Sequence, residues 1–217
     1  NNMWALLNSD EDAIVEIISN PKQMTVAEIT HPKTLFNLWT DAERKAIGIV
    51  PVTTSGSHLN SAYYIEVDEA YAIADDKASV VRTIGEKAAD RVLADTDVVD
   101  DDDEPVLDDH DNQKVILGLK SQAKNKANTV ADSHIKGFDW LIQRKVTHDT
   151  TIPSAILTYI AAVRTAHASI CTAIDNASDM AAFIALHVNE LNDDGTLKTI
   201  RKVQAWPDDY AVKGSRR

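Results

Sequence analysis

A run of acidic residues divides this 217-residue chain into two parts. Residues 95–111 hold ten Asp and Glu side chains and no Lys or Arg. Residues 1–94 carry 14 acidic and 8 basic side chains, and residues 112–217 carry 10 and 14, so the net charges of the three parts are −6, −10 and +4 in chain order. A segment so charged buries too little apolar surface to offset the entropy of ordering it. We therefore expect an acidic linker at 95–111 between two folded modules.

The first module, residues 3–94, has the pattern of a small β-rich domain. Apolar residues on both sides of the polar segment 8–12 predict a hairpin over residues 4–19. Thr40 and Glu43 have the spacing of a capping box and predict one short helix. Further expectations are strands at 24–30, 49–52, 62–67, 71–74 and 78–84, an edge position for the strand with Pro51, and a helical start at 85–93.

A regular apolar stripe dominates the second module, residues 112–205. Its members recur at steps of four and three, which is one face of an α-helix, and most are β-branched, so burial must stabilise this helix. We interpret the stripe as internal core; the alternative is a seam for a partner helix or a second copy of the chain. The stripe consists of Ile156, Ile160, Val163, His167, Ile170 and Ile174. Helices are also predicted at 112–136, 140–146 and 179–191, and a mobile tail at 206–217.

These patterns predict an α+β protein: a small β-rich N-terminal domain, an acidic linker and an α-helical C-terminal domain. The overall acidity argues against sequence-independent binding of nucleic acid, which requires Lys and Arg for the phosphates. No apolar run approaches the length of a membrane span. Cys171 is the only cysteine, so an intramolecular disulfide is excluded.

No motif with the spacing of a catalytic, cofactor or metal site is found. The seven histidines show no paired metal spacing, and neither a GxSxG, a GxGxxG nor a phosphate-binding loop occurs. We therefore predict a non-enzymatic protein with no catalytic, cofactor-binding or metal-ligating residues. The acidic run lacks the Gly and alternating spacing of a calcium loop. An alternative role for the run is to lie along the Lys-rich face of the 112–136 helix, which salt would weaken.

Two segments resemble small structural proteins of tailed bacteriophages. The first covers residues 3–52 and has a Met-Trp hairpin, a Pro-x-x-Leu-Phe-x-x-Trp element and an Ile-Gly-Ile step. These elements are Met3-Trp4, Pro32, Leu35, Phe36, Trp39 and Ile47-Gly48-Ile49. The second covers residues 117–174 and is similar to the helical C-terminal part of the same family. Its landmarks are Phe138-Asp139-Trp140, Arg144-Lys145, Ile152-Pro153, Tyr159 and Val163-Arg164.

The resemblance implies a bacteriophage virion structural protein, in a tail fibre, a baseplate or a tail adaptor, located in the virion after assembly in the host cytoplasm. Alternatives are a tail-fibre assembly chaperone and a capsid decoration or fibre protein; a hydrolase or metal enzyme is the least favoured hypothesis. Implied partners are other virion proteins, further copies of the chain and a host surface receptor, with no nucleic acid and no membrane. Candidate packing or assembly residues are Trp39, Trp140, Ile156, Ile160, Val163, Ile170 and Ile174.

Overall fold

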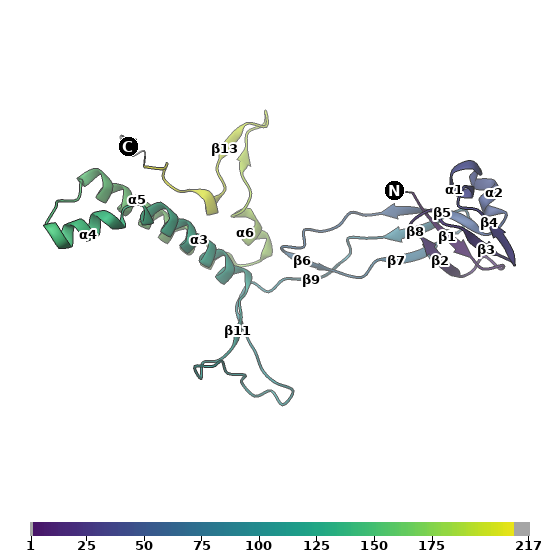
Figure 1. Ribbon diagram of the computed structural model, residues 1–217, viewed down its shortest axis with the longest axis horizontal. Coiled ribbons are helices and arrows are strands. Elements are labelled where there is room, and N and C mark those ends of the chain that lie inside the picture. The colour runs from purple at the N-terminus through teal and green to yellow at the C-terminus, as the bar shows by residue number, and fades with distance from the viewer. Residues whose placement is uncertain (1, 211–217) are drawn as a thin grey trace. The chain divides into compact units, whose positions relative to one another are not determined.

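The computed structural model describes residues 2–210, which belong to two compact units that divide between Asp90 and Arg91 (Figure 1). The first unit consists mainly of strands and the second mainly of helices, so the predicted α+β class is confirmed. Each unit has a hydrophobic core of its own. The division lies close to the predicted end of the first module at residue 94.

A five-stranded sheet with the order β2-β1-β5-β8-β7 forms the centre of the first unit. Its neighbours pair antiparallel except β5 and β8, which are parallel from Val52 and Val80 onward. Pro51 therefore lies in a central strand, and its predicted edge position is wrong. The proline is tolerated because β8 pairs with β5 only beyond it. The strands are β1 (Met3–Leu7), β2 (Ile14–Ile18), β5 (Ile49–Ser55), β7 (Ala70–Ile73) and β8 (Val80–Thr83).

Successive side chains along the strands point to opposite faces of this sheet, and both faces carry buried residues. Trp4 and Ile49 belong to a cluster with Phe36, while the adjacent Ala5 and Val50 belong to a second cluster on the other face. The first cluster is covered by a short hairpin and two short helices. These are β3 (Met24–Val26), β4 (Ile29–His31), α1 (Leu35–Leu38) and α2 (Asp41–Lys45).

Local signals in the first unit fold as predicted. Asn8 closes the β1–β2 hairpin, because its side-chain oxygen accepts the backbone N–H groups of Asp12 and Ala13 at 3.0 and 3.1 Å. Thr40 and Glu43 form the predicted capping box at the start of α2. The prediction of one helix is wrong, however, since α1 precedes α2. A helix this short is stable only when it packs on the rest of the protein, and its apolar residues Leu35 and Phe36 are buried.

A two-stranded ribbon extends the first unit. β6 (Tyr64–Glu66) pairs antiparallel with β9 (Lys87–Asp90), so the helical start predicted at 85–93 is wrong. Pairing through the backbone requires no apolar stripe, and all four residues of β9 are exposed. The chain enters strand β9 shortly after Gly85. The φ of Gly85 is +77°, and a Cβ there would lie 1.9 Å from the carbonyl oxygen of Ser57. Only glycine fits that position without displacing its neighbour.

The acidic run is hydrogen-bonded structure within the second unit, and the predicted linker at 95–111 is thereby corrected. β10 (Thr96–Asp97) pairs with β11 (Val115–Ile116) at its base. We call residues 96–116 the acidic excursion. The excursion lies just before the helix that begins at Leu119. At its base the Asp95 carboxylate accepts the backbone N–H of Gly118 and the hydroxyl of Ser121.

An eight-residue repeat explains how so charged a segment is ordered. Val98-Val99-Asp100-Asp101 recurs as Val106-Leu107-Asp108-Asp109. The backbone N–H of Val98 donates to the carbonyl of Lys114, that of Lys114 to Val106 and that of Val106 to Val98, at 2.8–2.9 Å. Each intervening loop is closed by an aspartate, since Asp100 and Asp108 each accept two backbone N–H groups. Backbone pairing and aspartate turns thus replace a hydrophobic core.

Helices packed on one long helix form the body of the second unit. The predicted stripe lies on α5, which packs mainly against α3. α3 begins at residue 119 rather than 112, because the residues before it pair within the acidic excursion. The elements are α3 (Leu119–Lys136), α4 (Asp139–His148), α5 (Ser154–Asn176), α6 (Met180–Ala185), β12 (Glu190–Leu191), β13 (Leu197–Thr199) and a 3-10 turn, η1 (Lys202–Gln204).

The segment after η1 is attached to the helical core. The ring of Tyr210 lies 5.6 Å from those of Phe138 and Tyr159. The mobile tail predicted from residue 206 is therefore wrong for residues 206–210, whose aromatic rings find partners on the core. Residues 211–217 lie outside the described residues.

Candidate functional site

Five of the predicted packing residues form the core of the second unit. Ile156, Ile160, Val163, Ile170 and Ile174 are all buried on α5. The first three belong to one cluster with residues of α3 and α4. The stripe therefore faces its own unit, in agreement with its interpretation as internal core.

The two predicted tryptophans lie in different settings. Trp39 is half-buried against the core of the first unit, and the imidazole of His31 meets its ring edge-on at 5.5 Å. Trp140 is 51% exposed on α4, with the Arg144 guanidinium 5.7 Å from its ring centroid. Such a contact is worth about 0.5–1 kcal/mol at an exposed position. Trp140 is therefore available at the surface, whereas Trp39 mainly packs.

A cavity of about 420 Å³ lies between α3 and the segment around η1. Ala127 and Val130 of α3 form one wall, and Val203 and Trp206 form the other. Trp206 is held in place because its indole N–H donates to the carbonyl of Val203 at 3.2 Å. The volume falls within the range of small-molecule and peptide-side-chain pockets.

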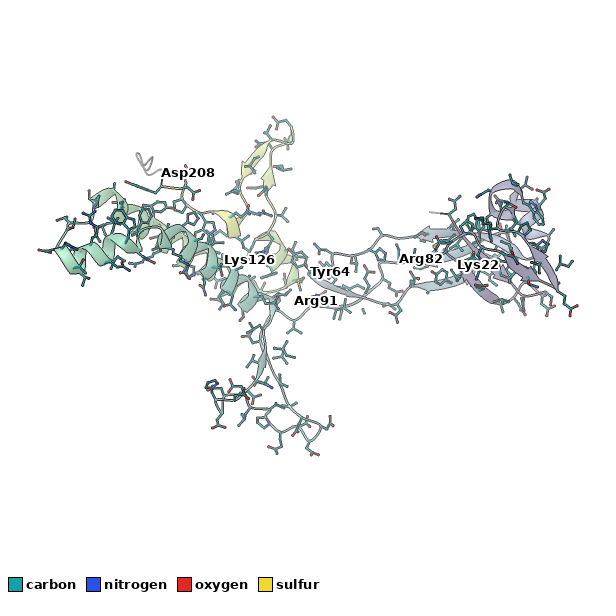
Figure 2. The ribbon with its side chains drawn as sticks, viewed as in Figure 1. Lys22, Tyr64, Arg82, Arg91, Lys126 and Asp208 are labelled. Carbon is teal, nitrogen blue, oxygen red and sulfur yellow. The ribbon has the colours of Figure 1, made fainter. Side chains whose placement is uncertain are left out.

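Basic side chains give this cavity its charge. Lys126 of α3, labelled in Figure 2, and Arg201 both line it, together with His187 and Gln204. Neither Lys126 nor Arg201 forms an ion pair within residues 2–210. The Nε atom of Arg201 is also buried, and no residue between 2 and 210 offers it a hydrogen-bond acceptor. An unpaired buried donor costs about 1–3 kcal/mol, so an acceptor placed here would be stabilising.

Two histidine rings lie beside the ring of Trp206. His134 and His167 stack near it, at centroid distances of 5.7 and 6.5 Å. His134 also contacts the hydroxyl of Tyr159 at 2.7 Å, and burial raises the pKa of that hydroxyl. This aromatic group fixes one wall of the cavity to the core.

Cys171 and His167 are adjacent but form no activated pair. The sulfur lies 3.4 Å from the Nε2 atom of His167. Burial, followed by the charge of Asp175, raises the pKa of the Cys171 thiol. A thiol with a raised pKa stays protonated at neutral pH and is a poor nucleophile.

Between residues 2 and 210, no three His, Cys, Asp or Glu side chains gather in a way that could hold a metal ion. No helix in the same part is long and apolar enough to cross a membrane.

The predicted docking of the acidic run on the Lys-rich helix is not seen among the described residues. Lys124 pairs instead with Asp175 of α5 at 2.8 Å, and Lys120 donates to the Asp175 carbonyl. These lysines connect α3 to α5. The run is thus left without an ion pair in residues 2–210.

Sequence patterns missed most of the cavity. Lys126 falls within the predicted 112–136 helix, and no pattern in the sequence marks Arg201 or Gln204 as part of a site. Trp206 followed by Pro207 was the one available signal, because an isolated tryptophan in a polar segment usually packs on something. No protein-family model, no curated protein and no solved structure matches this chain.

Proposed function

We propose that this chain is a structural protein of a tailed-bacteriophage virion that acts by protein–protein assembly, in a tail fibre, baseplate or tail adaptor. The resemblance of residues 3–52 and 117–174 to such proteins supports the proposal. The geometry adds support of a different kind, because the features that stand out are surfaces suited to partners.

The amount of exposed surface is the observation that carries this proposal. Nineteen large apolar side chains among residues 2–210 are at least 41% exposed. Surface of this extent is typical of chains that are covered by partners or further copies.

Large apolar side chains contribute to that surface. The β12–β13 hairpin alone exposes Val188, Leu191, Leu197 and Ile200 by 44–58%. Its two strands pair only with each other in the described chain, which leaves backbone groups on both outer edges. Exposed apolar edges of this kind are either covered by a partner or prone to aggregation.

Mass spectrometry of purified particles tests the proposal. Phage particles from the host culture that produces this protein would be banded on a density gradient and digested. We expect peptides of this chain at a constant ratio to the major capsid protein. Absence from the particles would contradict the proposal, and presence only in the particle-free lysate, bound to fibre protein, would favour an assembly chaperone.

A further inference from the structure

The acidic excursion and the basic cavity are complementary in charge, and neither is ion-paired within residues 2–210. The ten carboxylates of residues 95–111 form no ion pair in the described chain, and Lys126 and Arg201 form none either. Within the described residues, the hydrogen bonds of residues 98–114 stay inside the excursion. The described part of each copy therefore carries one acidic element and one basic element whose charges are not paired.

We propose that the acidic excursion of one copy docks in the basic cavity of a second copy, which rests on the proposed function as an assembly protein. Because donor and acceptor surfaces differ, the contact is heterologous unless two copies dock each other reciprocally as a closed dimer. Such contacts close into rings or continue as filaments. Either outcome produces a repeated assembly from a single chain type.

The apolar parts of the two surfaces also match. Val99 and Leu107 occupy equivalent positions in the eight-residue repeat and are each 49% exposed. Each precedes the aspartate that closes its loop, so an apolar side chain is presented beside carboxylates. The cavity offers the complementary arrangement, with Val203 and Trp206 beside Arg201.

Arginine makes the cavity selective for carboxylates. Its guanidinium can hold a carboxylate with two parallel hydrogen bonds, and its buried Nε atom still lacks an acceptor. The further carboxylates of the excursion would act mainly by steering it towards the cavity of a second copy. Salt weakens this steering, because charges more than about 8 Å apart are screened at physiological salt. Association should consequently be strong at low salt and weak at high salt.

Charge reversal on the basic side tests the proposal in the full-length chain. Self-association of the wild type would be measured by sedimentation velocity at low and high salt, next to Lys126→Glu/Arg201→Glu. The matched control is Lys33→Glu/Lys136→Glu, which changes the charge equally at two exposed lysines outside the cavity. Circular dichroism checks that each variant is folded. We expect the cavity variant to lose about tenfold or more in association constant, and the control to lose far less.

A charge swap guards against a folding artefact. Asp101→Lys/Asp109→Lys reverses two carboxylates for which no side-chain hydrogen bond is found in the excursion, so its loops are retained. Alone this variant should also associate weakly, and mixing it with the cavity variant should restore a complex. Failure of the mixture to associate would overturn the docking.

Other results separate this docking from the proposed function. Salt-independent self-association that is unchanged by the cavity variant would overturn the docking and leave an assembly protein. A chain that stays monomeric at every concentration, with cross-links only within one copy, would also overturn it, and particle mass spectrometry would then decide the function on its own.

Discussion

Arg44 shows how much of the first unit depends on a single side chain. The residue is 8% exposed, and its Nη1 atom donates to the carbonyls of Leu35, Phe36 and Trp39. Its Nη2 atom donates to Asp41 at 2.6 Å. The guanidinium thereby supplies donors to the carbonyls at the end of α1, of which that of Leu35 also accepts the backbone N–H of Trp39.

Replacing Arg44 by methionine should destabilise the first unit by about 2–4 kcal/mol, because the buried carbonyls lose their donor. Lys33→Met, at an exposed position nearby in sequence, is the control and should change stability by less than about 0.5 kcal/mol. Urea unfolding followed by tryptophan fluorescence measures both. Equal stability of the two variants would contradict the role assigned to Arg44.

Gly85 is the second residue whose identity the fold requires. Gly85→Ala should cost about 1–2 kcal/mol for the left-handed backbone, and more because Ser57 must move. Gly137→Ala is the contrasting change, since φ there is −61° and no atom lies within 4 Å of an added Cβ. Thermal unfolding should show a lower transition temperature for the first variant and an unchanged or higher one for the second.

Among the elements, helix α5 and the acidic excursion are stabilised by different interactions. The helix is stabilised by burial of an apolar stripe, and its pattern was therefore visible in the sequence. The excursion is stabilised by backbone pairing and aspartate turns. Composition alone predicted a linker, because charge and low hydrophobicity are also the signature of disorder.

Two substitutions on α5 test the importance of the stripe. Ile174 is fully buried, whereas Leu157 is 51% exposed on the same helix. Ile174→Ala should destabilise the second unit by about 2–5 kcal/mol, while Leu157→Ala should cost less than about 0.5 kcal/mol. Chemical unfolding followed by circular dichroism at 222 nm measures the difference. Similar costs would show that the stripe does not carry the stability of the unit.

Acid should open the second loop of the excursion. The backbone N–H groups of Asn112 and His110 hold the pKa of Asp108 below its ordinary value of 3.8. Stabilisation from a lowered pKa is present above the ordinary value and is lost as the pH falls through the folded value. NMR titration of the Asn112 and His110 amides should show a midpoint below 3.8. A midpoint at or above that value would contradict the predicted loop.

At the scale of the whole molecule, the order of modules was predictable and the sites between distant segments were not. The hairpin at Asn8, the capping box at Thr40 and the α5 stripe are local signals, and all three were found. The cavity joins α3 to residues more than 70 positions later, such as Arg201, and no local pattern specifies that contact. Trp39 and Trp140 were singled out together, yet only the second is largely exposed.

Assembly of copies of this chain through the acidic excursion and the basic cavity can be tested in solution. Carbodiimide cross-linking of a one-to-one mixture of ¹⁵N-labelled and unlabelled chains tests it most directly, because this reagent joins a lysine amine to a carboxylate in contact with it. We predict mixed-isotope cross-links between Lys126 and residues 97–111 at low salt, with few from Lys136. Cross-links from Lys126 only within one copy, or an equal yield from Lys136, would contradict the claim.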